Sequence, residues 1–234
     1  IDLRERGYMV FRLGIQEGTK GAHFALAKLR DPYDWSEYFL IDDEIFSGIK
    51  PESFLPNVSI RQLFAFELLS GLTEKSFINL AISSGLMASA LDIETSESLA
   101  APASSSGSFT FSFLPSRELI TPWFHNNGQV EIDALFVGKR RGEEVLFVIE
   151  AKTSDKFKSL SKHKLVYPIL AISSRVPSSI PIVPVYLRAI KPSSSNYVDF
   201  YIAECKPIER HSEYIVVNEL EVVQARHLTL MGLR

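Results

Sequence analysis

The sequence predicts an α/β (α+β) protein in which a mixed central sheet is flanked by helices and follows a mostly helical N-terminal region. Three observations support this fold class. Hydrophobic residues make up 46% of the 234 residues, which is enough to bury a core. Apolar residues recur mainly at helical spacing before residue 101, whereas the period of two that marks strands predominates after it. One helical stretch lies between two strands in the second part, as in the crossover connections of α/β proteins.

We expect the chain to divide at residues 101–107, a segment of Ala, Pro, Ser and Gly that is typical of a linker. Residues 1–101 are then a mixed, mainly helical region, and residues 102–234 form a second domain built on the sheet. A short strand is expected at Gly7–Leu13 in the first region, because its side chains alternate in polarity.

Three helices are expected in the rest of that first region. The first covers Ser59–Leu69 and is capped by Ser59, the second begins after Thr73, and the third covers Leu86–Leu91. The last two give a weak helix-turn-helix pattern, so a DNA-gripping role for the region stays open. Ordinary helix packing is favoured because no basic recognition face accompanies the pattern.

The second region is predicted to contain strands, a charged turn at Gly138–Gly142 and a helix over Ser154–Ser173 that Pro168 should kink or interrupt. The predicted strands share alternating or continuous apolar character. They are Ser108–Phe113, Gln129–Val137, Val145–Ala151, Ile182–Ala189 and Tyr197–Cys205.

Composition excludes several classes of protein. The net charge of −3 is not that of a chain that coats nucleic acid nonspecifically. The single cysteine, Cys205, rules out an internal disulfide framework and a cysteine-rich zinc site, and it favours a reducing, cytoplasmic location. No apolar run is long enough for a transmembrane helix, so no membrane association is expected. No signal peptide is visible, and the start at Ile1 leaves open an upstream segment.

Acidic and basic side chains stand out in the hairpin expected around the Gly138–Gly142 turn. Glu131 and Asp133 share one face of the first strand, and Glu150 and Lys152 share one face of the second, because side chains alternate along a strand. Glu150 follows an apolar run, where an unpaired charge is costly. Two carboxylates suit Mg²⁺, the carbonyl of Ala151 offers a third oxygen, and a lysine can assist phosphodiester hydrolysis.

The pattern of Glu131-Ile132-Asp133 followed by an apolar strand ending Glu150-Ala151-Lys152 resembles the PD-(D/E)XK nucleases. This superfamily includes restriction endonucleases and Holliday junction resolvases. The resemblance covers about residues 129–188. It implies a restriction-endonuclease-like core, metal ligands at Asp133 and Glu150, and a catalytic lysine at Lys152. It also implies Mg²⁺ as the cofactor, with Mn²⁺ able to substitute, DNA as the substrate and a homodimer.

The chain departs from the family pattern in two respects. Ile132 stands where the family name has Pro, and the helix after the lysine strand has no Gln. Many members carry a further acid on a helix before the hairpin. The candidates for that acid are Glu67 and, second, Glu118; Glu131 is a further candidate for a supporting acid.

Two basic clusters are candidates for contact with the DNA backbone, although a solvated turn is favoured for the first and a solvated helix face explains the second about as well. The first is the hairpin tip, comprising Lys139, Arg140 and Arg141. The second is expected on the helix after the lysine strand, comprising Lys156, Lys158, Lys162 and Lys164.

The sequence therefore favours a Mg²⁺-dependent endodeoxyribonuclease of restriction or repair type. One alternative is a catalytically inactive module with the nuclease fold that binds DNA or protein. Another is an unrelated α/β enzyme or self-association domain in which the acid-x-lysine pattern arose by chance. Separation of the Asp133 and Glu150 carboxylates would favour the last.

Overall fold

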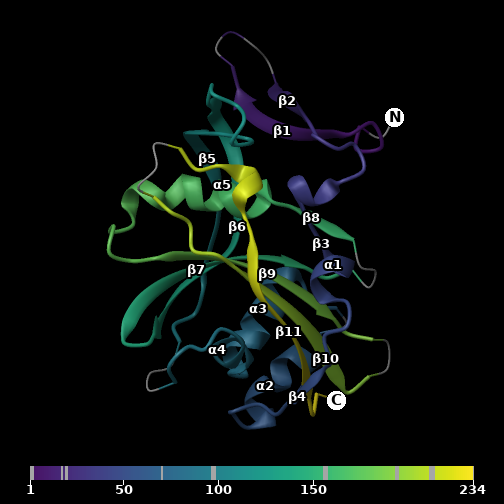
Figure 1. Ribbon diagram of the computed structural model, residues 1–234. Helices are drawn as coiled ribbons and strands as arrows, with labels where there is room; N and C mark the ends of the chain where they lie inside the picture. Colours follow the sequence, from purple (N-terminus) through teal and green to yellow (C-terminus); the bar gives the residue numbers. More distant parts are fainter. Residues whose placement is uncertain are drawn as a thin grey trace.

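The computed structural model describes residues 3–16, 18, 21–69, 71–95, 99–154, 158–192, 195–210 and 214–233. Figure 1 shows a broad twisted sheet with helices packed on both sides of it. The described residues form a nine-stranded mixed sheet with the order β2-β1-β6-β7-β9-β10-β11-β4, and β5 pairs with β6 outside this path. The strands are β1 (Tyr8–Ile15), β2 (Ala22–Lys28), β4 (Glu52–Phe54), β5 (Ala103–Phe113), β6 (Trp123–Arg140), β7 (Glu143–Lys152), β9 (Ile182–Ile190), β10 (Tyr197–Cys205) and β11 (Val222–Met231).

The remaining elements lie around this sheet. Strand β3 (Phe39–Ile41) pairs with β8 (Ser159–Ser161) to form a separate two-stranded sheet. The helices are α1 (Asp42–Phe46), α2 (Ile60–Glu67), α3 (Glu74–Ser83), α4 (Leu86–Ala90) and α5 (His163–Ile172), with short 3₁₀ turns at Trp35–Glu37, Ser173–Arg175 and Val217–Glu219.

Strands β7 and β9 are parallel neighbours at the centre of the sheet, and α5 lies in the connection between them. Residues Val145–Ala151 of β7 are all buried, which explains their nearly continuous apolar sequence. Helices α2, α3 and α4 pack with one face of the sheet, and α5 packs with the other face. The C-terminal ends of β7 and β9 therefore lie at the edge of the sheet, between the two hydrophobic cores.

The expectation of a restriction-endonuclease-like core preceded by a mostly helical N-terminal region is wrong. The described chain is rich in strands, and β1, β2, β3 and β4 all lie before residue 101. Strands from both sides of residue 101 join one large sheet. The three expected N-terminal helices are present but short, and Ser59 and Thr73 cap α2 and α3 with their side chains as predicted.

Three local boundaries also differ from expectation. The supposed linker at residues 101–107 belongs largely to β5, which begins at Ala103 and pairs with β6. The turn between β6 and β7 is only Arg141-Gly142, both with positive φ, as a type I′ hairpin turn requires. The helix expected from Ser154 begins at His163, and Pro168 lies inside α5 without interrupting it.

Within the described residues, no helix has the length and apolar character needed to cross a membrane.

Candidate active site

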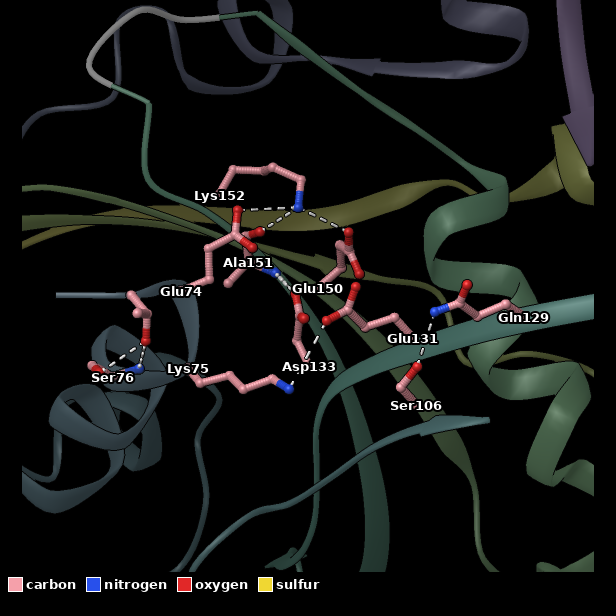
Figure 2. Close-up of polar contacts among 11 residues, drawn as sticks. Glu74, Lys75, Ser76, Ser106, Gln129, Glu131, Asp133, Glu150, Ala151 and Lys152 are labelled. Carbon is pink, nitrogen blue, oxygen red and sulfur yellow. Dashed lines mark hydrogen bonds and ion pairs between the residues drawn. The ribbon is translucent and has the colours of Figure 1, made fainter. Parts of the chain in front are cut away.

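The candidate site forms where the ladder between β6 and β7 ends. The last paired residues in that direction are Ala134 and Ile149. Beyond them, the main-chain N–H of Ala151 donates a hydrogen bond of 3.0 Å to Oδ2 of Asp133. The Asp133 side chain therefore accepts the bond that a main-chain carbonyl would accept in a regular ladder, and it ties the end of β7 to β6 (Figure 2).

A β-bulge in β6 places Asp133 in this position. Ala103 pairs with Leu135 and Ser105 pairs with Ile132, so β6 has one more residue than β5 across this step. An extra residue of this kind changes the direction of the side chains around it. Asp133 is 5% exposed, so its carboxylate is nearly buried rather than exposed to solvent on a strand face.

Lys152 places its ammonium group among three oxygen atoms. Its Nζ donates hydrogen bonds to the main-chain oxygen of Ala151 at 2.6 Å, Oε1 of Glu150 at 2.9 Å and Oε1 of Glu74 at 3.3 Å. The three acceptors and Asp133 lie together in Figure 2. The structure thus brings together the three residues that the sequence singled out.

Glu74 is a site residue that the sequence analysis missed. It is the first residue of α3, directly after the Thr73 cap, and it reaches Lys152 from the helix layer. A usable signal existed, because the apolar residue Phe77 follows three positions later and residues three apart share a helix face. Glu74 therefore had to lie on the side of α3 that meets the sheet.

Burial and charge shift the protonation of two site residues. Burial raises the pKa of Glu150 to about 7; the Lys152 ammonium opposes this rise and the Asp133 carboxylate adds to it. Burial acts to lower the pKa of Lys152, but the carboxylates of Glu150 and Glu74 outweigh it and the pKa is raised. Lys152 is therefore a cation at neutral pH, while Glu150 lies near its titration point.

The donor set fits a hard divalent cation. Among the described residues, no group of three or more His, Cys, Asp or Glu side chains is arranged to hold a metal. A site here would instead combine the carboxylates of Asp133 and Glu150 with the Ala151 carbonyl, which are the oxygen ligands that Mg²⁺ prefers. The Lys152 ammonium already occupies an all-oxygen environment that includes two of these donors, which shows that the position suits a positive charge.

Comparison with protein families places most of this chain in one group. A family model described as "Domain of unknown function (DUF6997)" matches residues 42–221. The chain belongs to this family. The match includes Glu74, Asp133, Glu150 and Lys152, so the whole candidate site lies within the DUF6997 region, whereas β1 and β2 lie outside it. No curated protein and no solved structure matches the chain.

The other acids considered from the sequence have different positions in this DUF6997 chain. Glu131 lies at the rim of the site, largely exposed, with its carboxylate 3.9 Å from Nζ of Lys75. Glu67 ends α2, which is not the helix that reaches Lys152. Glu118 pairs with Arg30 at 3.2 Å on the surface.

The basic hairpin tip lies away from the candidate site. Arg140 is six residues beyond Ala134 along β6, which corresponds to about 20 Å of strand. Both terminal nitrogens of Arg140 donate to the Glu204 carboxylate, at 2.7 and 2.9 Å. Lys139 is exposed on β6, and Arg141 is exposed in the turn.

The second group of lysines does not form one helix face, because the helix begins only at His163. Lys158 is exposed and precedes β8, whereas Lys162 is 8% exposed and donates to the main-chain oxygen of Asn218 at 2.9 Å. Lys164 is exposed in the first turn of α5, and its charge acts to lower the pKa of Glu150. Lys164 is thus the member of this group that lies near the site. Lys156 lies outside the described residues.

Proposed function

We propose that this chain is a metal-dependent endonuclease that hydrolyses DNA phosphodiester bonds. The observation that carries the proposal is the convergence of Asp133, Glu150 and Lys152 where β6 and β7 separate. These residues occupy the positions at which the sequence resembles the PD-(D/E)XK nucleases. Burial of two acids beside a half-buried lysine is expensive to maintain, and such clusters are common at functional sites.

Each residue has a distinct role in this proposal. Mg²⁺ or Mn²⁺ held by Asp133, Glu150 and the Ala151 carbonyl would supply Lewis acidity and a bound water of lowered pKa. Lys152 remains protonated and offsets the negative charge that develops on the phosphate. Glu74 and Glu150 orient the Lys152 ammonium from two sides.

The cations at the site support a phosphate-bearing substrate. Lys152 and Lys164 lie near Glu150, and Lys75 lies at the rim beside Glu131. These charges provide a local attraction for the DNA backbone that the overall charge of the chain does not provide.

The proposal also includes a restriction or repair role, a homodimer and a cytoplasmic location. Light scattering of the purified chain would test the homodimer, and the buried free thiol of Cys205 is compatible with a reducing compartment.

A cleavage screen tests the proposed function. The wild-type chain would be incubated with Mg²⁺ or Mn²⁺ and with plasmid, single-stranded, flapped and four-way DNA. Lys152→Ala would be run beside it, with Lys206→Ala as a control that removes an exposed lysine outside both basic clusters. We expect metal-dependent products from the wild type and from Lys206→Ala, and none from Lys152→Ala. DNA binding without hydrolysis under any metal would instead identify an inactive binding module.

A further inference from the structure

The β1–β2 hairpin presents an outer face with a regular pattern of aromatic, apolar and basic side chains. Three cross-strand pairs form this face, because residues directly opposite each other point to the same side of a sheet. The pairs are Tyr8 with Lys28, Val10 with Leu26, and Arg12 with Phe24. We call these six residues the outer hairpin face. An aromatic ring is thus placed opposite a cation at each end of it.

The outer hairpin face is exposed although it is partly apolar. Phe24 is 61% exposed and Leu26 is 49% exposed, while Arg12 and Lys28 are also on the surface. The sequences of β1 and β2 contain no Asp or Glu. A surface that combines exposed rings with positive charge suits an anionic ligand that has flat apolar groups.

The fold does not need this face for its own core. The opposite side of the hairpin carries Met9, Phe11 and Ala27, which are buried in the core that includes α5. The hairpin is also fixed through its main chain, since Nδ1 of His125 lies 2.9 Å from the Arg12 oxygen. The inner side therefore anchors the hairpin and leaves the outer side available.

A groove lies beside the hairpin, between β1 and the start of α5. It has a volume of about 320 Å³ and is lined by residues that include Tyr8 and Val10 of β1 and Ser161 and His163 near the start of α5. The next residue, Lys164, is the exposed cation whose charge acts on Glu150. The β1–β2 hairpin lies at one end of the molecule (Figure 1).

We propose that the outer hairpin face binds a single strand of nucleic acid. Phe24 and Tyr8 stack on unpaired bases, and Arg12 and Lys28 contact the phosphates between them. A single strand fits better than a duplex because stacking on rings requires bases that are free on one face. The identity of the ligand rests on the proposed nuclease function. The hairpin precedes the residues matched by the DUF6997 family, and in this proposal it selects the substrate for the candidate site.

Binding measured without metal tests this inference separately from catalysis. Fluorescence anisotropy in EDTA would compare a labelled oligothymidylate with a labelled duplex for the full chain. Phe24→Ala should weaken binding of the oligothymidylate by roughly tenfold, in line with the loss of one stacked base. The double variant Arg12→Ala/Lys28→Ala should reduce the slope of log affinity against log salt by about 0.7 for each lost phosphate contact. Phe64→Ala on α2, which also removes an exposed ring, and Lys206→Ala should leave both quantities unchanged.

The outcomes separate the two proposals. Phe24-dependent binding by a chain that cleaves no DNA would support the outer hairpin face and overturn the nuclease function. If the wild type cleaves DNA, and Phe24→Ala has wild-type circular dichroism and binds the oligothymidylate as tightly as the wild type, only the proposal for the outer hairpin face is overturned. A wild-type dimer that Phe24→Ala dissociates, with unchanged oligonucleotide binding, would also overturn it by showing that a second copy covers the face.

Discussion

The N–H of Ala151 donates to the carboxylate of Asp133 at the point where β6 and β7 stop pairing through their main chains. This contact fixes the residue between Glu150 and Lys152 relative to Asp133. The geometry of the candidate site therefore depends on a bond between a side chain and the main chain rather than on flexible side chains alone.

Glu150→Gln should stabilise the metal-free chain at a pH above 7. The pKa of Glu150 is raised to about 7 from an ordinary value near 4.5, so between these values the folded chain binds a proton that the unfolded chain has lost. Stability therefore falls as the pH rises through that window, and the neutral amide avoids the loss. Thermal unfolding should show a higher Tm, by roughly 2–4 °C for each kcal/mol gained in the free energy of unfolding. Glu204→Gln, which weakens a pair with Arg140, should lower the Tm; a lower Tm for Glu150→Gln would contradict the assignment.

Glu74→Gln should reduce cleavage less than Lys152→Ala does. The substitution removes one of the charged partners of Lys152, while the contacts with Glu150 and the Ala151 oxygen remain. We expect a loss of roughly tenfold in single-turnover rate and a smaller change in DNA affinity. Glu67→Gln on α2 is the matched control and should cut at the wild-type rate. Equal rates for Glu74→Gln and the wild type would exclude Glu74 from the site.

His163→Phe should make the protein more resistant to acid. Burial lowers the pKa of His163 to about 3, with the nearby Lys164 and His125 adding to the effect. An unfolded histidine has a pKa of about 6.5, so the unfolded chain gains a proton between these values and stability falls as the pH falls. Free energies of unfolding at about pH 7 and about pH 4 should differ less in His163→Phe than in the wild type. An unchanged difference would show that another group governs acid unfolding.

Arg188→Met should destabilise the fold strongly. Arg188 is 1% exposed, and its Nη1 donates to Oδ2 of the fully buried Asp42 at 2.6 Å. Removing one partner of a buried pair costs roughly 3–5 kcal/mol, because the remaining charge stays buried. Urea unfolding should also show that the double variant Asp42→Asn/Arg188→Met loses less free energy of unfolding than the sum of the losses in the two single variants. Additive losses would mean that the two charges do not interact.

The hairpin and its acids could be predicted because they depend on short-range patterns. Strand alternation places Glu150 and Lys152 on one side, and the apolar run before Glu150 marks β7 as a central strand. The position of Asp133 depends on the bulge in β6, for which the period of the sequence gives no sign. The cluster could therefore be predicted, whereas the contact that organises it could not.

The strand expected at Gly7–Leu13 is present as β1, but the other N-terminal strands could not be predicted because their structure depends on distant partners. Strand β2 has the sequence AHFALAK, which is rich in good helix formers, and its pairing with β1 overrides that preference. Strands β3, β4 and β8 have three residues each, too few to show a period. The helix expected from Ser154 is shortened for the same reason, since β8 exists only by pairing with β3.

The rate of plasmid cleavage by Asp133→Asn in Mg²⁺ tests the central claim most directly. The amide keeps an oxygen that can accept the Ala151 hydrogen bond, so the variant removes the charge at the site and preserves the fold. Asp199→Asn on β10, which keeps its own contacts with His227 and Thr229, is the matched control. We predict that the wild type and Asp199→Asn cut the plasmid, and that the single-turnover rate of Asp133→Asn falls by at least about 100-fold. Cleavage by folded Asp133→Asn at the wild-type rate would contradict a metal-dependent nuclease site at this position.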